Sequence, residues 1–103
     1  MTKEEIFKAY TEVVCNRFKI SYSQLFNKSK QREIVDARFT LYYMCSKRPM
    51  RTSQIQKFMA NNEYNIAHSC IIYGIKQMTN TIYNDEDYKD VIQELENNAV
   101  HII

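Results

Sequence analysis

Residues 28–45 read KSKQREIVDARFTLYYMC, a basic loop that continues into a long segment with helical periodicity. The apolar residues of this segment form one broad stripe at helical spacing: Ile34, Val35, Ala37, Phe39, Leu41, Tyr42 and Cys45. A helix that is apolar around so much of its circumference is typically a central one, on which other helices pack. The segment therefore predicts the core helix of the fold.

Basic charge is concentrated around the start of this helix. Residues 28–51 hold seven cations and two anions, a balance of +5, whereas the whole chain carries +2. The cations are Lys28, Lys30, Arg32, Arg38, Lys47, Arg48 and Arg51. Residues 84–103 are the opposite, with six acidic residues and one lysine. Two ordinary solvated surfaces would account for this split, but cations in a loop that leads into a helix also suit a phosphate backbone.

Length and composition limit the class of protein. The 103 residues suit a single domain, and one glycine and one proline argue against a β architecture with many turns. The three cysteines are widely spaced and odd in number, which fits a reducing cytoplasm better than a disulfide framework. The polar start and the lack of an apolar run of ~18 residues predict a cytoplasmic protein, in the host cytoplasm if it is phage-encoded.

Caps and apolar spacing predict about six helices and an all-α fold. Thr2 with Glu5 predicts a first helix that runs to about Phe18, and Ser21 caps a short helix near residues 22–26. The central helix follows the basic loop (residues 27–32) and ends before Pro49.

The second half of the chain predicts three further helices. Thr52 or Ser53 can cap a fourth, a turn at residues 61–62 can cap a fifth over about residues 63–82, and residue 84 or 85 can cap a sixth. The fifth helix is expected to bury Ile66, Cys70, Ile71, Tyr73, Ile75 and Met78, and Gly74 indicates close packing against another helix. The fourth and fifth helices, about residues 52–80, have the spacing of a helix-turn-helix.

The string Leu25–Arg38, LFNKSKQREIVDAR, resembles the opening of the C-terminal DNA-binding domain of the bacterial replication initiator DnaA. In that family a short apolar helix leads through a Ser/Lys/Arg loop into a long helix that starts Glu-Ile-Val-x-Ala-Arg. The likeness extends from about Val14 to about Leu95, and residues 66–70, IAHSC, resemble a His-Ala-Cys segment in the second of the family's paired helices. The resemblance implies a helix-turn-helix domain with double-stranded DNA as its partner.

The chain departs from the family between the paired helices. MANNEYN, residues 59–65, replaces a Gly-Gly turn and an Arg-Asp-His-Thr-Thr run that reads bases and phosphates. The family's preferred DNA site is therefore not carried over. Chemically, Asn61, Asn62 and Asn65 can pair with adenine edges and Tyr64 can contact a thymine methyl or a phosphate, or these residues serve only to cap a helix. No Gly-x-x-x-x-Gly-Lys-Ser/Thr segment is present, so we expect the DNA-binding module to stand alone, as it can in phage or mobile-element genes.

The resemblance also implies roles for individual residues. Lys28, Lys30 and Arg32 would reach a minor groove or its phosphates, and Arg38 would be either a backbone contact or a structural ion pair. The complete set expected to contact DNA is Lys28, Ser29, Lys30, Arg32, Arg38, Arg51, Asn61, Asn62, Tyr64, Asn65 and His68.

Catalytic chemistry has little support in the sequence. His68 and Cys70 lie about 200° apart around a helix and cannot form a dyad, and no set of four ligands has zinc spacing. We expect no enzymatic activity, no cofactor or metal, no membrane contact and no small-molecule substrate. The leading hypothesis is a double-stranded DNA-binding protein in replication control or transcription regulation, with host replication proteins as further partners. The alternative is a protein-interaction or virion-associated module that keeps the fold without base readout.

Overall fold

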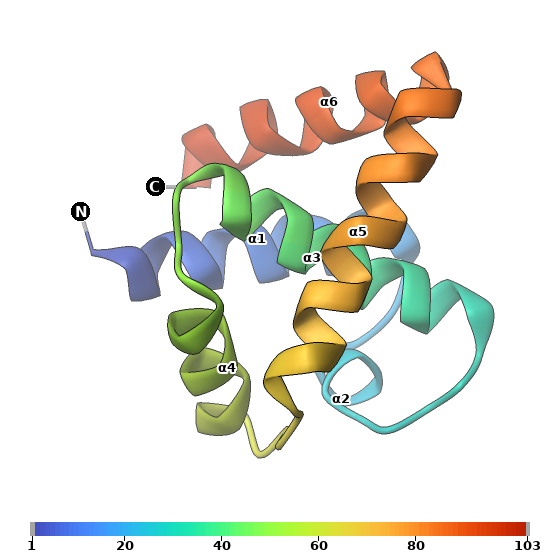
Figure 1. Cartoon of the computed structure of the whole chain (residues 1–103). Coiled ribbons are helices and arrows are strands. Elements are labelled where there is room, and N and C mark those ends of the chain that lie inside the picture. The colour runs from blue at the N-terminus through green and yellow to red at the C-terminus, as the bar shows by residue number, and fades with distance from the viewer. Residues whose placement is uncertain (1, 103) are drawn as a thin grey trace.

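The computed structural model describes residues 2–102, which form six α-helices and, within that range, no strand (Figure 1). The helices are α1 (Lys3–Phe18), α2 (Tyr22–Leu25), α3 (Arg32–Lys47), α4 (Thr52–Asn61), α5 (His68–Asn84) and α6 (Glu86–Ile102). The all-α class and the number of helices are as predicted.

The central helix of the fold is α3, which contacts each of the other five (Figure 1). Five residues of its predicted stripe are buried, namely Ile34, Ala37, Leu41, Tyr42 and Cys45, whereas Val35 and Phe39 are half-buried. Gly74 of α5 lies against this helix, where an added Cβ would come within 2.7 Å of Phe39 Cδ1 and 3.0 Å of Tyr42 Cδ2. The close packing that Gly74 indicated is therefore confirmed.

Side-chain caps explain where three of the six described helices begin. Thr2, Ser21 and Asp85 cap α1, α2 and α6, because the side chain of each accepts a hydrogen bond from a backbone N–H of the first turn. α4 differs, since its N-cap is Arg51, one residue before the earlier of the two predicted caps. The side-chain oxygen of Gln54 accepts from the Arg51 N–H at 2.9 Å and closes that end of the helix.

The predicted start of α5 was wrong, because α4 ends in a left-handed turn. Glu63 has φ 63°, its N–H donates to the Ala60 carbonyl, and the Tyr64 N–H donates to the Met59 carbonyl. This pair of bonds is a Schellman motif, which reverses the chain and sends Tyr64 into the core. Residues 62–67, called the connector below, are therefore irregular, and α5 begins at His68.

The buried face of α5 also differs from the predicted one. Ile71, Gly74 and Met78 are its buried residues, whereas Cys70 and Tyr73 are exposed. Close contact between Gly74 and α3 sets the rotation of the helix about its axis, which turns residues 69, 72, 73 and 76 outward.

Candidate nucleic-acid interface

The basic loop is held in place by a buried arginine. Arg38 of α3 is 5% exposed, and its guanidinium donates hydrogen bonds to the backbone carbonyls of Leu25, Asn27 and Ser29. These donors point inward, so the expectation that Arg38 contacts DNA is wrong. Its role is structural, with carbonyls as partners instead of the carboxylate of an ion pair.

Lys28 ties this loop to the connector. Its ammonium donates a 2.6 Å hydrogen bond to the carbonyl of Asn65 and lies 5.5 Å from the centroid of the Tyr64 ring. Tyr64 is only 6% exposed, which contradicts its expected contact with a thymine methyl or a phosphate. The sequence placed it on the surface because its neighbours are polar, whereas the turn at Glu63 directs it inward. The basic loop and the connector consequently lie side by side.

Two cations of the loop are free for a ligand. Lys30 is exposed, and the side chain of Arg32 is 91% exposed with a single 3.8 Å pair to Asp36 one turn along the helix. Exposed pairs of this kind contribute little and exchange readily. Ser29 is half-buried, and its hydroxyl accepts the Gln31 N–H at 3.1 Å, which shapes the loop before α3.

The N-terminus of α5 lies next to the bridge between these loops. Its N-cap is Ala67, which has no side-chain acceptor, so no side chain of the described structure caps this helix. His68 and Ser69 in its first turn are both exposed. Uncapped N–H groups together with the positive end of the helix dipole favour an anion such as a phosphate.

The outward face of α5 continues from this end. Ser69, Ile72, Tyr73 and Lys76 are exposed, with Ile72 at 41% and Tyr73 at 57%. The Tyr73 ring packs edge-on against Phe39 at 6.0 Å between centroids, which limits its movement. Sequence reasoning missed this face because it assigned Tyr73 to the core. The spacing of Ile71, Gly74 and Met78, three and then four residues apart, was the signal that these residues form the buried face and that Tyr73 points outward.

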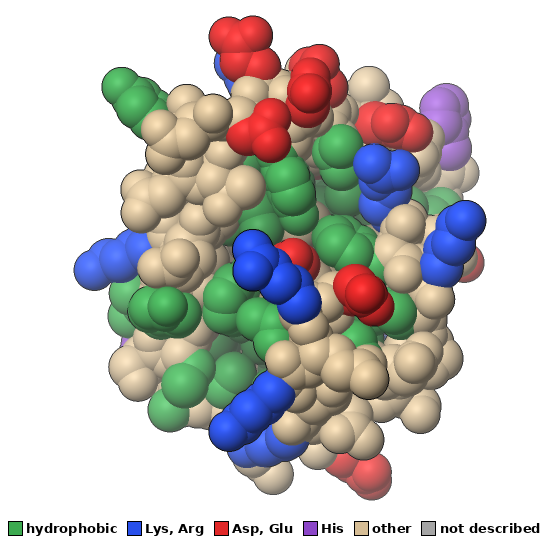
Figure 2. Space-filling view, turned by 90° about the vertical axis from the view of Figure 1, so that its right-hand side faces the viewer, with side chains coloured by type: hydrophobic (Ala, Val, Ile, Leu, Met, Phe, Trp, Pro, Cys, Tyr) green, Lys and Arg blue, Asp and Glu red, His purple; other side chains and the backbone are tan. Residues whose placement is uncertain are grey.

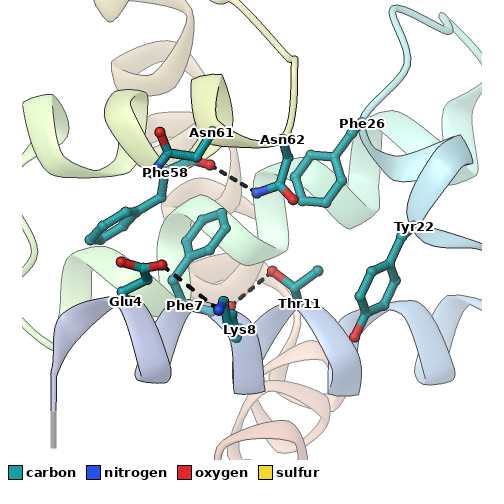
Figure 3. Close-up of a pocket in the computed structure, with 9 residues that line it drawn as sticks. All are labelled: Glu4, Phe7, Lys8, Thr11, Tyr22, Phe26, Phe58, Asn61 and Asn62. Atoms are coloured by element: carbon teal, nitrogen blue, oxygen red, sulfur yellow. Dashed lines mark hydrogen bonds and ion pairs between the residues drawn. The ribbon is translucent and has the colours of Figure 1, made fainter.

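The asparagines at the end of α4 do not cap α5. Asn61 and Asn62 are exposed and line a hollow of about 290 Å³. Figure 3 shows that the residues lining this hollow come from α1, α4 and the region of α2. Asn62 donates its side-chain amide to the Phe58 carbonyl at 2.9 Å and so closes α4. Asn65, by contrast, is exposed on the connector beside Lys28.

Arg51 is separated from the cations of the basic loop. It precedes α4, whose ten residues span about 15 Å before the connector begins. The structure thus brings together Lys28, Lys30, Arg32, Asn65 and His68, and it leaves Arg51 at the far end of α4.

Half of the acidic residues, those of residues 85–96, lie away from the basic loop, at the start of α6 and along it. Figure 2 shows several carboxylate side chains around the α5–α6 junction, while others lie lower, next to Lys and Arg side chains. Within residues 2–102, the 3.2 Å contact of Lys47 with Glu96 is the only ion pair between α6 and a lysine or arginine. The carboxylates of α6 therefore leave the cations of the basic loop free.

Other kinds of site find no support among the described residues. No group of three or more His, Cys, Asp or Glu side chains there could hold a metal ion. None of the six helices has the length and apolar character that crossing a bilayer requires.

Sequence comparison relates the chain to known proteins. Residues 8–78 match the family described as the bacterial dnaA protein helix-turn-helix. The chain is 28% identical over 96 residues to the chromosomal replication initiator protein DnaA of Bacteroides thetaiotaomicron, and 26% identical over 96 residues to that of Bacteroides fragilis. Each alignment covers 92% of this chain but only 20% and 19% of those proteins, so the chain spans about a fifth of their length. No solved structure matches. Because the family match covers more than half of the chain, with α3, α4 and α5 as far as residue 78, the chain belongs to the bacterial DnaA helix-turn-helix family of DNA-binding domains.

Proposed function

We propose that this domain binds double-stranded DNA with two neighbouring elements, the basic loop and the N-terminal half of α5. The observation that carries the proposal is the Lys28–Asn65 bridge, which holds the free cations of the loop beside an uncapped helix N-terminus. Lys30 and Arg32 contact phosphates or a minor groove, and α5 enters the adjacent major groove.

The outward face of α5 supplies the base contacts in this proposal. The Ser69 hydroxyl can donate to or accept from a base edge, and Lys76 can reach a phosphate. Ile72 and Tyr73 present apolar surface where a helix in the major groove meets the methyl groups of thymine. Asn65 and His68 border this face and can add polar contacts to bases or the backbone. The proposed site is consequently one that contains thymine in the major groove opposite Ile72 and Tyr73.

The experiment that tests the proposal is selection of bound sequences from a random duplex pool, followed by anisotropy titration of the enriched duplex. Binding that weakens as salt rises, together with an enriched motif, supports the proposal. The proposal fails if the folded protein has no affinity for any duplex at low salt.

The biological context belongs to the same proposal. A domain of this kind acts in replication control or transcription regulation, for instance in a phage or mobile element, where it can compete with a host initiator for DNA sites. Host replication proteins are then the partners to examine, by pull-down with the purified domain in the presence and absence of the selected duplex.

A second candidate function is docking of a protein partner at the acidic end. Tyr83 is 88% exposed next to Glu86 and Asp90, which line the same surface hollow. Comparing pull-down of proteins with DNA binding of the same sample separates the two candidates, because a pure interaction module captures a protein and shifts no duplex.

A further inference from the structure

The basic loop and the N-terminus of α5, which are proposed to contact DNA, come from distant parts of the chain. The buried ring of Tyr64 lies close to the two cations that hold the loop and the connector in place, Arg38 and Lys28. The Tyr64 ring centroid is 5.2 Å from the Arg38 guanidinium carbon and 5.5 Å from the Lys28 ammonium. Both distances are within the range of cation–π attraction, which strengthens when the cation is shielded from water, as it is at Arg38.

Each cation also bonds to a backbone. Arg38 holds the basic loop through carbonyls of that loop, and Lys28 holds the connector through the carbonyl of Asn65. Tyr64 belongs to the connector and packs in the core, three residues before Ala67, the N-cap of α5. A shift of the loop relative to α5 would therefore have to break contacts of the Tyr64 ring.

We infer that Tyr64 is a positioning residue that fixes the distance and rotation between the basic loop and the N-terminus of α5. This inference rests on the proposed DNA binding, and it specifies the class of site. The two DNA segments that the protein contacts must be separated by one fixed number of base pairs.

The physical reason is effective concentration. When two contacts are rigidly linked, forming the first places the second at high effective concentration, but only on a ligand with the matching span. One inserted base pair moves the second segment by about 3.4 Å along the duplex and turns it by about 35°. A rigid pair of elements cannot follow that change, whereas a loosely joined pair can.

The test uses two duplex probes. The first is the duplex that the wild-type protein enriches from a random pool, with its two contacted segments mapped by hydroxyl-radical footprinting. The second has one base pair inserted between those segments. We expect wild type to bind the second probe about tenfold or more weakly than the first, as for the loss of a base contact.

The variants then ask whether Tyr64 sets that ratio. Tyr64→Leu removes the ring and is expected to bring the two affinities within about threefold of each other, while Tyr64→Phe keeps the ring and the wild-type ratio. A general loss of stability lowers the folded fraction for both probes alike and leaves the ratio unchanged, so the ratio separates positioning from a merely structural role.

A second variant covers the case in which Tyr64→Leu does not fold. Lys28→Met changes an exposed side chain, removes the bond to Asn65 and is also expected to reduce the ratio. Lys47→Met, the same substitution at the opposite end of α3, is the control and keeps the wild-type ratio.

Two results would decide against the inference in different ways. A wild-type ratio in Tyr64→Leu and in Lys28→Met overturns the positioning role while DNA binding stands. Failure of the wild-type protein to bind any duplex removes the proposed function itself, and the positioning role with it.

Discussion

Removing two cations from the basic loop, in the variant Lys30→Ala/Arg32→Ala, should make DNA binding less dependent on salt. Lys30 is exposed and Arg32 has only an exposed pair to Asp36, so neither side chain supports the fold. The variant should therefore keep the circular dichroism spectrum and the melting temperature of wild type, to within a few degrees.

The size of the effect follows from the number of phosphate contacts. Lys30, Arg32, Lys76 and the positive end of α5 give about four, and so a slope of log affinity against log salt near −3.6. Between about 50 and about 200 mM salt the wild-type affinity should then fall about 150-fold. The variant keeps about two contacts and a slope near −1.8, so its affinity should fall only about 12-fold over the same range.

Fluorescence anisotropy with one labelled duplex, titrated at several salt concentrations, measures both slopes. The matched control is Lys47→Ala/Lys89→Ala, which removes the same charge from the far end of α3 and from α6. That end lies about 24 Å along the helix from the loop. If the loop variant has the wild-type slope, or if the control lowers the slope equally, the loop does not contact the phosphates.

Three further predictions concern the base contacts, the packing and the thiols. Replacing thymine by uracil in the selected site should weaken wild-type binding about fourfold per contacted methyl, because each buried methyl contributes about 0.8 kcal/mol. The same replacement should weaken DNA binding by the variant Ile72→Ala/Tyr73→Ala less. Equal losses in both proteins would show that these two side chains do not contact the thymine methyls. Gly74→Ala should lower the free energy of unfolding by about 1–2 kcal/mol, because overpacking against Phe39 and Tyr42 outweighs the gain in helix propensity, and a raised melting temperature would contradict this. Burial raises the pKa of Cys15 to about 11 and also raises the pKa of Cys45, so the thiolates of both residues are scarce at neutral pH. A thiol reagent should therefore modify the exposed Cys70 first. Rapid modification of all three thiols in the native protein would show that Cys15 and Cys45 are not buried.

Those parts of the fold that depend on local signals could be predicted from the sequence. Thr2 and Ser21 are N-cap residues that predict the starts of α1 and α2. The wide apolar stripe of α3 predicts that the other helices pack on it. The basic loop was found for the same reason, since its charges are adjacent in the chain.

What could not be predicted depends on contacts between distant residues. Glutamate is not a residue type that indicates a left-handed turn, although Glu63 adopts one. The late start of α5 and the burial of Tyr64 therefore could not be predicted from the neighbouring residues. The role of Arg38 stayed open between a DNA contact and a structural residue, because its three carbonyl partners lie nine to thirteen residues earlier in the chain. The outward rotation of Tyr73 likewise depends on how Gly74 meets α3.

The most direct measurement is an NMR titration of the isotopically labelled domain with the selected duplex, following every backbone amide. If the basic loop and the N-terminal half of α5 form one DNA-contacting face, the largest shifts will fall in residues 28–32 and 65–76, and α6 will be little affected. Shifts confined to α6, or a spectrum that the duplex leaves unchanged, would show that this face does not bind DNA.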